Sequence, residues 1–189
     1  MNQLDDSLST NKPNFLWVVQ KVHRFIAFGF GSGLAPLAPG TVGTLWAWIL
    51  ALIVQQLPIS LSPIYILLAL FGGLILGIWA CGGSGRDLNQ VDHGGMVWDE
   101  MIAFWLILLL MMPTDFYHQA LAFIIFRFFD AVKPGPISSI DEWFKTWRPN
   151  QQLSMNRILF IRGFGVMIDD LAAALATLWV LAIIQTLFH

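Results

Sequence analysis

Apolar residues gather in five long stretches along the chain, separated by short polar connections. The stretches cover about 42–57, 64–80, 101–112, 116–129 and 171–188, and no Lys, Arg, Asp or Glu occurs between positions 25 and 85. A helix needs about 20 apolar residues to cross about 30 Å of hydrocarbon, and only the second and last stretches come close. The pattern therefore predicts an all-α polytopic membrane bundle with about four to five membrane-embedded helices. The shorter ones are tilted, re-entrant or packed inside the bundle.

The N-terminal segment MNQLDDSLSTNKPNFLW is polar and acidic before its first apolar residues. It lacks the basic region followed by an apolar region that marks a signal peptide. We expect residues 1–14 to form a disordered tail and residues 15–189 to form a single membrane domain.

Composition agrees with a membrane protein and excludes several other classes. Hydrophobic residues make up 57% of the chain and charged residues 12%, against about 25% charged in soluble domains. The net charge of −2 and the absence of a long basic run give no indication of a nucleic-acid partner. The single Cys81 excludes an internal disulfide and a multi-cysteine metal site, and we expect it to be a buried small residue.

The basic residues divide unequally between the two sides of the predicted bundle. The connections at 58–63 and 113–115 and the C-terminus share one side, which carries no Lys or Arg. Because cytoplasmic loops are rich in Lys and Arg, the other side is predicted to face the cytoplasm. The ten basic residues on that side are Lys12, Lys21, Arg24, Arg86, Arg127, Lys133, Lys145, Arg148, Arg157 and Arg162.

Four polar blocks converge on the predicted cytoplasmic face, and the first is GFGSGLAPLAPGTVGTL at 29–45. Its glycines can expose backbone amides, and Ser32, Thr41 and Thr44 add hydroxyls. If a helix starts at Thr41 or Val42, the block can bind an anion at the helix N-terminus. It is not a Walker A loop, because no Gly-Lys-Ser/Thr follows. A Gly/Pro turn that only lets the chain enter the membrane explains the block equally well.

The second block is DHGGMVWDE at 92–100. Asp99 and Glu100 lead directly into an apolar stretch, where acids are costly unless they are paired or bound to a cation. The alternative is that they cap the helix N-terminus and favour its dipole. Asp92 and His93 lie upstream in a Gly-flanked turn, and a lone His is more often a hydrogen-bonded structural group than a ligand.

The third block is FRFFDAVKPGP at 126–136. Arg127, Asp130 and Lys133 recur every three residues and share a helical face until Pro134 ends the helix. An acid flanked by two cations suits a metal ligand or a phosphate clamp. A salt-bridged helix end is the plainer alternative.

The fourth block, GFGVMIDDLAA, places Asp169 and Asp170 at the predicted start of the most apolar helix. Adjacent helical side chains point about 100° apart, so at most one of the two can aim straight at a shared site. The sequence does not choose between them.

Six carboxylates thus gather at one face of the predicted bundle. They would repel one another unless a cation sits among them. Oxygen ligands without a Cys or His cluster favour Mg²⁺ over zinc. The six are Asp92, Asp99, Glu100, Asp130, Asp169 and Asp170.

Taken together and in this order, the four blocks resemble the phosphatidylglycerophosphatase A family, over residues 29 to about 174. The resemblance implies an all-α, Mg²⁺-dependent enzyme of the bacterial inner membrane with its active site facing the cytoplasm. The implied reaction removes the terminal phosphate of phosphatidylglycerophosphate, and the product, phosphatidylglycerol, feeds membrane lipid and cardiolipin synthesis. The stretch 138–162 is longer than this pattern leads us to expect, and we expect it to lie on the anionic headgroup surface.

The resemblance assigns roles to the residues of the four blocks. The expected metal ligands and catalytic acids are Asp99, Glu100, Asp130, Asp169 and Asp170. The resemblance implies that Arg127 and Lys133 bind the phosphate. From the first block we add the hydroxyls of Ser32, Thr41 and Thr44, and we expect Asp92 and His93 in support. The attacking group is either a metal-bound water or one of the Asp carboxylates.

Two other classes of function remain as alternatives. A small transporter or channel would use acids in the middle of its apolar segments, on a path open to both sides of the membrane. A structural membrane subunit would tolerate loss of the carboxylates. Here the acids cluster at one end of the apolar segments, which favours the enzyme.

Overall fold

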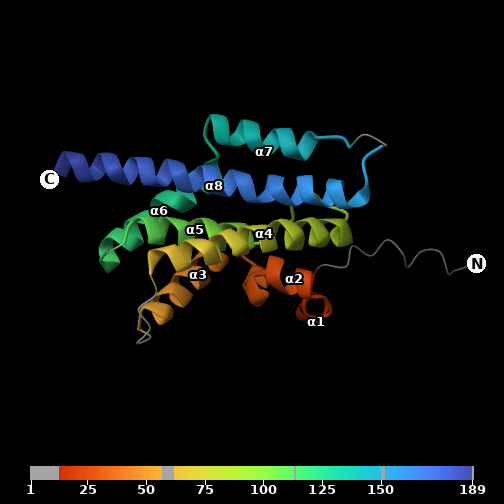
Figure 1. Cartoon of the computed structure of the whole chain (residues 1–189), viewed down its shortest axis with the longest axis horizontal. Helices are drawn as coiled ribbons and strands as arrows, with labels where there is room; N and C mark the ends of the chain where they lie inside the picture. Colours follow the sequence, from red (N-terminus) through yellow and green to blue (C-terminus); the bar gives the residue numbers. More distant parts are fainter. Residues whose placement is uncertain (1–12, 57–61, 113, 150–151, 189) are drawn as a thin grey trace, which may run out of the picture.

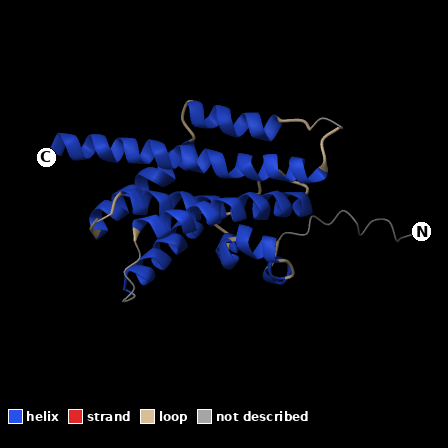
Figure 2. Cartoon of the chain, viewed as in Figure 1, coloured by secondary structure: helices blue, strands red, loops and turns tan. Residues whose placement is uncertain are grey.

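The computed structural model describes residues 13–56, 62–112, 114–149 and 152–188, and within these ranges it contains helices and no strand (Figure 2). The all-α prediction is therefore confirmed, while the predicted tail at 1–14 lies almost wholly outside the described residues. The elements are α1 (Phe15–Val19), α2 (Val22–Ala27), the 3₁₀ segment η2 (Gly29–Leu34), α3 (Pro39–Gln56), α4 (Pro63–Leu88), α5 (Trp98–Leu110), α6 (Phe116–Val132), α7 (Pro136–Thr146) and α8 (Met155–Phe188).

The short helix α5 lies at the centre of the bundle, with α8, α3 and α4 packed against it (Figure 1). Its side chains are apolar nearly all round, and Met101, Phe104 and Ile107 are fully buried. A helix that is hydrophobic on every face belongs in an interior. This explains why the 101–112 stretch is too short to be a conventional span: its 13 residues rise only about 20 Å.

Among the described residues, two helices, α4 and α8, are long and apolar enough to cross a membrane. Their outer faces expose large apolar side chains, among them Phe71 and Trp79 on α4 and Leu175 and Trp179 on α8. Contiguous apolar surface of this kind is rare on soluble monomers. The long helices and their apolar outer faces are consistent with a membrane protein.

Helix α8 begins much earlier than the apolar pattern predicts. It starts at Met155 rather than near position 171, so Asp169 and Asp170 lie in its middle and do not open it. The charged residues interrupt the hydrophobic signal, but the helix continues because it packs closely on its neighbours through small residues. A Cβ at Gly165 would collide with the Phe144 ring of α7, and Gly163 lies directly against the backbone of Ile78 in α4. The 34 residues of α8 rise about 51 Å, well beyond the hydrocarbon thickness.

Part of the long 138–162 stretch forms α7, an amphipathic helix that packs along α8 (Figure 1). Phe144 contacts Gly165 and Phe164, while the ring of Trp143 on the same helix is exposed. The stretch is thus tied to the bundle by its apolar side. Its contact with lipid headgroups remains a prediction.

The carboxylate of Asp87, at the end of α4, gathers the basic side chains of the N-terminal helices. Asp87 Oδ2 accepts hydrogen bonds from Arg24 Nε and Lys21 Nζ at 2.9 and 3.0 Å and lies 2.9 Å from His23 Nε2. Arg24 is buried and also stacks over the Trp17 ring, with 3.9 Å from its guanidinium carbon to the ring centroid. The ion pair therefore joins α2 to the end of α4.

Replacing Asp87 by Asn is expected to destabilise this junction. The buried Arg24 guanidinium would lose its counter-ion, and removing one partner of a buried pair costs about 3 kcal/mol. For a chain of this size that corresponds to a Tm lower by about 6–12 °C, measurable by thermal unfolding in detergent. The control is Asp115→Asn, at the exposed N-cap of α6, where Asn caps as well as Asp and Tm should hold. Equal Tm values for both variants would contradict the prediction.

Candidate active site

The first turn of α5 meets the middle of α8, and three carboxylates come together there. Asp99, Glu100 and Asp170 each contribute one carboxylate oxygen to this point. These three oxygens lie within 4.8 Å of one another. Asp99 and Asp170 are buried and Glu100 is nearly so. The packing of α5 on α8 thus unites acids that are about 70 positions apart in the sequence.

Two oxygens of this acidic cluster (Asp99, Glu100 and Asp170) have no hydrogen-bond donor in the described part of the chain. Glu100 Oε2 and Asp170 Oδ2 are both buried, and among the described residues neither has a hydrogen-bond partner. Buried polar atoms without partners are rare in native structures and call for a specific explanation. A cation that prefers oxygen ligands would satisfy both, and three carboxylates without a Cys or His ligand suit Mg²⁺, Mn²⁺ or Ca²⁺. The residues present therefore fit a divalent metal.

Arg127 on α6 joins three helices beside the acidic cluster. Its Nη1 lies 2.5 Å from Asp130 Oδ2 and 3.8 Å from Glu100 Oε1, and it donates to Thr44 Oγ1 at 3.3 Å. The Asp130 carboxyl in turn approaches that of Asp170. The Nε of Arg127 is buried without a partner among the described residues. A guanidinium with unused donor capacity beside a cation site is the arrangement expected for binding phosphate oxygens.

The N-terminus of α3 packs against Glu100 and Arg127 at the edge of the acidic cluster. The helix begins at Pro39, slightly before the predicted start at Thr41 or Val42. A Cβ on Gly40 would clash with Glu100 Oε1 and stand only 3.0 Å from Arg127 Nη2, so only glycine leaves room there. Within the described chain, no acceptor takes the Gly40 or Thr41 N–H. These amides lie at the positive end of the helix dipole, where anions bind favourably.

Lys133 forms a second charged group next to the acidic cluster. It does not continue the face of α6, as the three-residue spacing predicted, because α6 ends at Val132 and Lys133 takes a left-handed conformation with φ 45°. Its Nζ contacts Asp169 Oδ2 and donates to Asp141 Oδ1 at 3.0 Å. The second partner comes from α7. Lys145, one turn along α7, also donates to Asp141 and lies 3.3 Å from Asp92.

Opposite charges keep this second group ionised. Burial alone would lower the pKa of Lys133, but the carboxylates of Asp169 and Asp141 raise it above its usual value. Burial would raise the pKa of Asp141, yet hydrogen bonds from Lys145 and Lys133 hold it below its usual value. Lys133 is therefore a permanent cation beside the acidic cluster.

The structure separates the two adjacent aspartates of α8. Asp170 points into the acidic cluster, whereas Asp169 pairs with Lys133. The turn of about 100° between neighbouring helical residues produces this division. The Oδ1 of Asp169 is buried without a partner among the described residues.

Three of the predicted site residues make their hydrogen bonds elsewhere. The Ser32 hydroxyl donates to the Gly29 carbonyl within its own turn, and His93 Nδ1 accepts the Gly95 N–H. Asp92 forms an ion pair with Lys145. Thr44 does reach the site, although its hydroxyl holds Arg127 and donates to the Gly40 carbonyl at 2.8 Å.

Sequence reasoning missed Asp141, Lys145 and Gly40 as individual site residues. The available signal for the first two was their four-residue spacing on a helix, which favours an ion pair. Nothing in the sequence distinguishes Gly40 from the other glycines of its block.

Comparisons with known proteins agree in pointing to one family. A family model described as phosphatidylglycerophosphatase A matches residues 25–185. An Escherichia coli K12 protein named phosphatidylglycerophosphatase A is 35% identical over 158 residues, covering 84% of this chain and 80% of that protein. A Haemophilus influenzae protein of the same name is 36% identical over 162 residues, covering 86% and 88%.

A third relative carries a different name. A Bacteroides thetaiotaomicron protein, whose name is given as an unproven phosphatidylinositol-3-phosphatase, is 31% identical over 177 residues, covering 91% of this chain and 95% of that protein. No solved structure matches the chain.

Proposed function

The chain belongs to the phosphatidylglycerophosphatase A family, and from this premise we propose that it hydrolyses phosphatidylglycerophosphate to phosphatidylglycerol and phosphate. One observation supports the chemistry most directly: the buried acidic cluster has two oxygens without partners and lies beside an arginine with an unused donor. Such a group of residues fits a divalent cation and a phosphate monoester together.

Mg²⁺ is the proposed cofactor, held by Asp99, Glu100 and Asp170 with Asp130 beside them. When bound, Mg²⁺ would supply Lewis-acid stabilisation of the negative charge on the phosphate oxygens. The chain's own cations and amides act on the same oxygens. Arg127 offers a planar fork of donors, and the Gly40 and Thr41 amides add donors at the N-terminus of α3.

The remaining charged residues hold this apparatus in place. Two groups fix the Arg127 guanidinium: Asp130, on the same helix α6, and the Thr44 hydroxyl, on α3. Lys133, tied to Asp169, adds a second cation near the cluster. Because these groups are positioned before substrate arrives, little reorganisation is needed as charge develops in the transition state.

We further propose that the protein is a multi-pass protein of the bacterial inner membrane with its acidic cluster on the cytoplasmic side. Four to five embedded helices would be drawn from α3, α4, α5, α6 and α8. The side that carries all ten basic residues supports the orientation.

Reconstitution into lipid vesicles tests the proposed activity. Purified protein with Mg²⁺ is expected to release inorganic phosphate from phosphatidylglycerophosphate. Parallel samples contain phosphatidylinositol 3-phosphate, which the third relative's name suggests, and a water-soluble phosphate monoester. Release from phosphatidylinositol 3-phosphate alone would reassign the substrate. No release from any lipid, together with ion flux across the vesicles, would favour the transporter alternative.

Gly40→Ala is expected to lower kcat/KM by about a hundredfold. The added Cβ displaces Glu100 or Arg127, and small misplacements in a positioned site have effects of this size. The higher helix propensity of Ala offsets part of this strain, so we expect the loss of stability to be small beside the loss of activity. Gly72→Ala is the matched control, because a Cβ at that position in α4 meets nothing within 4 Å. Equal activity of the two variants would show that α3 does not close the site.

A further inference from the structure

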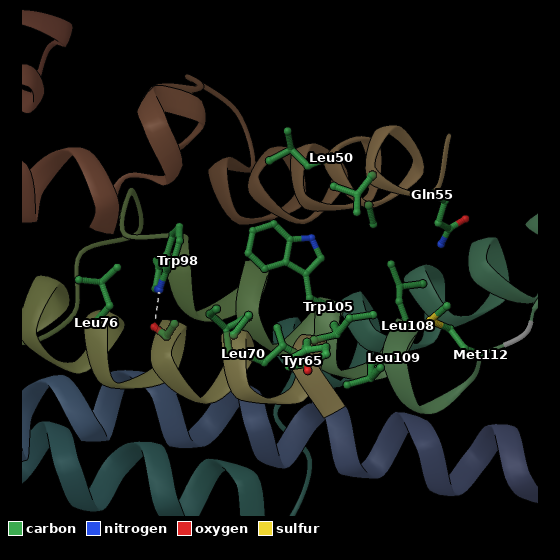
Figure 3. A pocket seen from close by; sticks show the side chains of 16 residues that line it. Leu50, Gln55, Tyr65, Leu70, Leu76, Trp98, Trp105, Leu108, Leu109 and Met112 are labelled. Atoms are coloured by element: carbon green, nitrogen blue, oxygen red, sulfur yellow. Dashed lines mark hydrogen bonds between the residues drawn. The ribbon is translucent and has the colours of Figure 1, made fainter. Parts of the chain in front are cut away.

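An apolar groove runs along α5 on a different face from the acidic cluster. Its volume is about 590 Å³, and its walls come from α3, α4 and α5. Figure 3 shows the lining side chains, which extend from Trp98 and Leu76 at one end to Gln55 and Met112 at the other. The Gln55 amide lies at the second end and the Tyr65 hydroxyl near the middle of the view (Figure 3), and the other lining side chains are apolar or tryptophan.

The groove exists because α3 and α4 both pack on α5 but hardly touch each other. Two tryptophans of α5 line the space between them without leaving polar atoms unpaired. Trp98 Nε1 donates to the Gly73 carbonyl of α4 at 2.9 Å, and Trp105 Nε1 donates to the Ala47 carbonyl of α3 at 2.7 Å. The indoles thus fasten both walls, and their rings present apolar surface to the groove (Figure 3).

At one end, the groove and the acidic cluster share the first turn of α5. Trp98 lines the groove, and the next two residues, Asp99 and Glu100, belong to the cluster. From this end the groove follows α5 from Trp98 to Leu109, a rise of about 16 Å. One leaflet of hydrocarbon is about 15 Å thick, half of the full bilayer core. The groove therefore has the length and polarity of a single acyl chain, and it begins at the same turn of α5 that carries Asp99 and Glu100.

We propose that this groove binds an acyl chain of the phosphorylated glycerolipid substrate while its phosphate occupies the acidic cluster. This inference rests on the proposed lipid phosphatase function and adds a second binding region to it. Acyl binding that is equal in the ground and transition states lowers KM without raising kcat, and this is the behaviour that we expect here. The occupant is the substrate's own chain, rather than a bulk membrane lipid or a helix of a second copy.

Two substitutions that fill the groove test the proposal. Ala51→Trp on α3 and Ala69→Trp on α4 each place an indole among the lining residues. Leu67→Trp is the matched control, on the same helix as Ala69 but exposed outside the groove. Each groove variant should raise KM for a long-chain substrate about tenfold or more with kcat nearly unchanged, and should leave hydrolysis of a dihexanoyl substrate unaffected. The control should match the wild type on both substrates.

Two results would overturn the acyl-chain assignment. One is an unchanged KM for the long-chain substrate in both groove variants. The other is an equal loss on the long-chain and short-chain substrates, which would mean that the indoles disturb the phosphate site itself.

Photochemical labelling separates failure of this inference from failure of the proposed function. Phosphatidylglycerophosphate with a diazirine at the end of one acyl chain is irradiated with the wild-type protein in detergent. Labels are expected on α3, α4 and α5 peptides of the groove, and excess unlabelled substrate should remove them. Labels that only bulk phosphatidylcholine removes, or cross-links between two copies of the chain, would refute the proposal. If the wild type releases no phosphate, the proposed function fails, and competed labelling would still report lipid binding.

Discussion

Asp170→Asn is expected to reduce kcat for phosphatidylglycerophosphate about a thousandfold while changing KM little. Asp170 is buried and contributes to the acidic cluster, and one of its oxygens has no partner among the residues that the structure describes. The substitution keeps the side-chain volume but removes a negative ligand from the proposed cation site. Loss of several kcal/mol of transition-state stabilisation corresponds to this fall in rate, since each 1.36 kcal/mol is about tenfold.

Asp169→Asn is the internal control for that result. Its carboxylate contacts Lys133 rather than the acidic cluster, so its effect on the reaction is indirect. Residues that orient other site residues typically contribute about 10- to 100-fold. Steady-state kinetics on both variants, with circular dichroism to show that each is folded, would decide the assignment. A greater loss from Asp169→Asn than from Asp170→Asn would exchange their roles.

The convergence of the four polar blocks could be expected from sequence, because charged residues are costly inside an apolar bundle and tend to be drawn together. The hydrophobic pattern does not predict the packing contacts that decide where a helix begins and ends. Helix α8 extends back to Met155 because Gly163 and Gly165 let α4 and α7 approach it closely. A reader of the sequence sees only that Asp169 and Asp170 interrupt an apolar run.

The sequence also did not predict the direction of side chains at the helix ends. The spacing of Arg127, Asp130 and Lys133 favoured a shared face, and the first two do form an ion pair three residues apart. Lys133 leaves that face because the chain turns into the left-handed region just before Pro134. Its partner Asp141 comes from a helix that composition alone did not mark as part of the site. Local spacing predicts contacts within a helix and says little about contacts between helices.

Removal of divalent cations is expected to abolish phosphate release, and addition of Mg²⁺ to restore it. The oxygens of Glu100 and Asp170 that lack partners among the described residues support this prediction independently of kinetics, because a cation bound there before substrate would satisfy them. A ligand at a hundred times its Kd stabilises the folded state by about 2.7 kcal/mol. For a chain of this length, saturating Mg²⁺ should therefore raise Tm by about 5–10 °C. Thermal unfolding with and without a chelator measures the shift.

The change in Tm caused by Asp170→Asn, measured with and without Mg²⁺, gives a stricter test of the cation site. Without a cation, the like charges of Asp99, Glu100 and Asp170 repel one another, so Asp170→Asn should raise Tm in chelator relative to the wild type. With Mg²⁺ the order should reverse, because the variant has lost a ligand and gains little from the ion. A purely structural acidic cluster, held by Arg127 and hydrogen bonds alone, would give the same ranking of the two proteins in both conditions. A crossing of the two Tm values therefore distinguishes a cation site from a salt-bridged helix junction, without any measurement of activity.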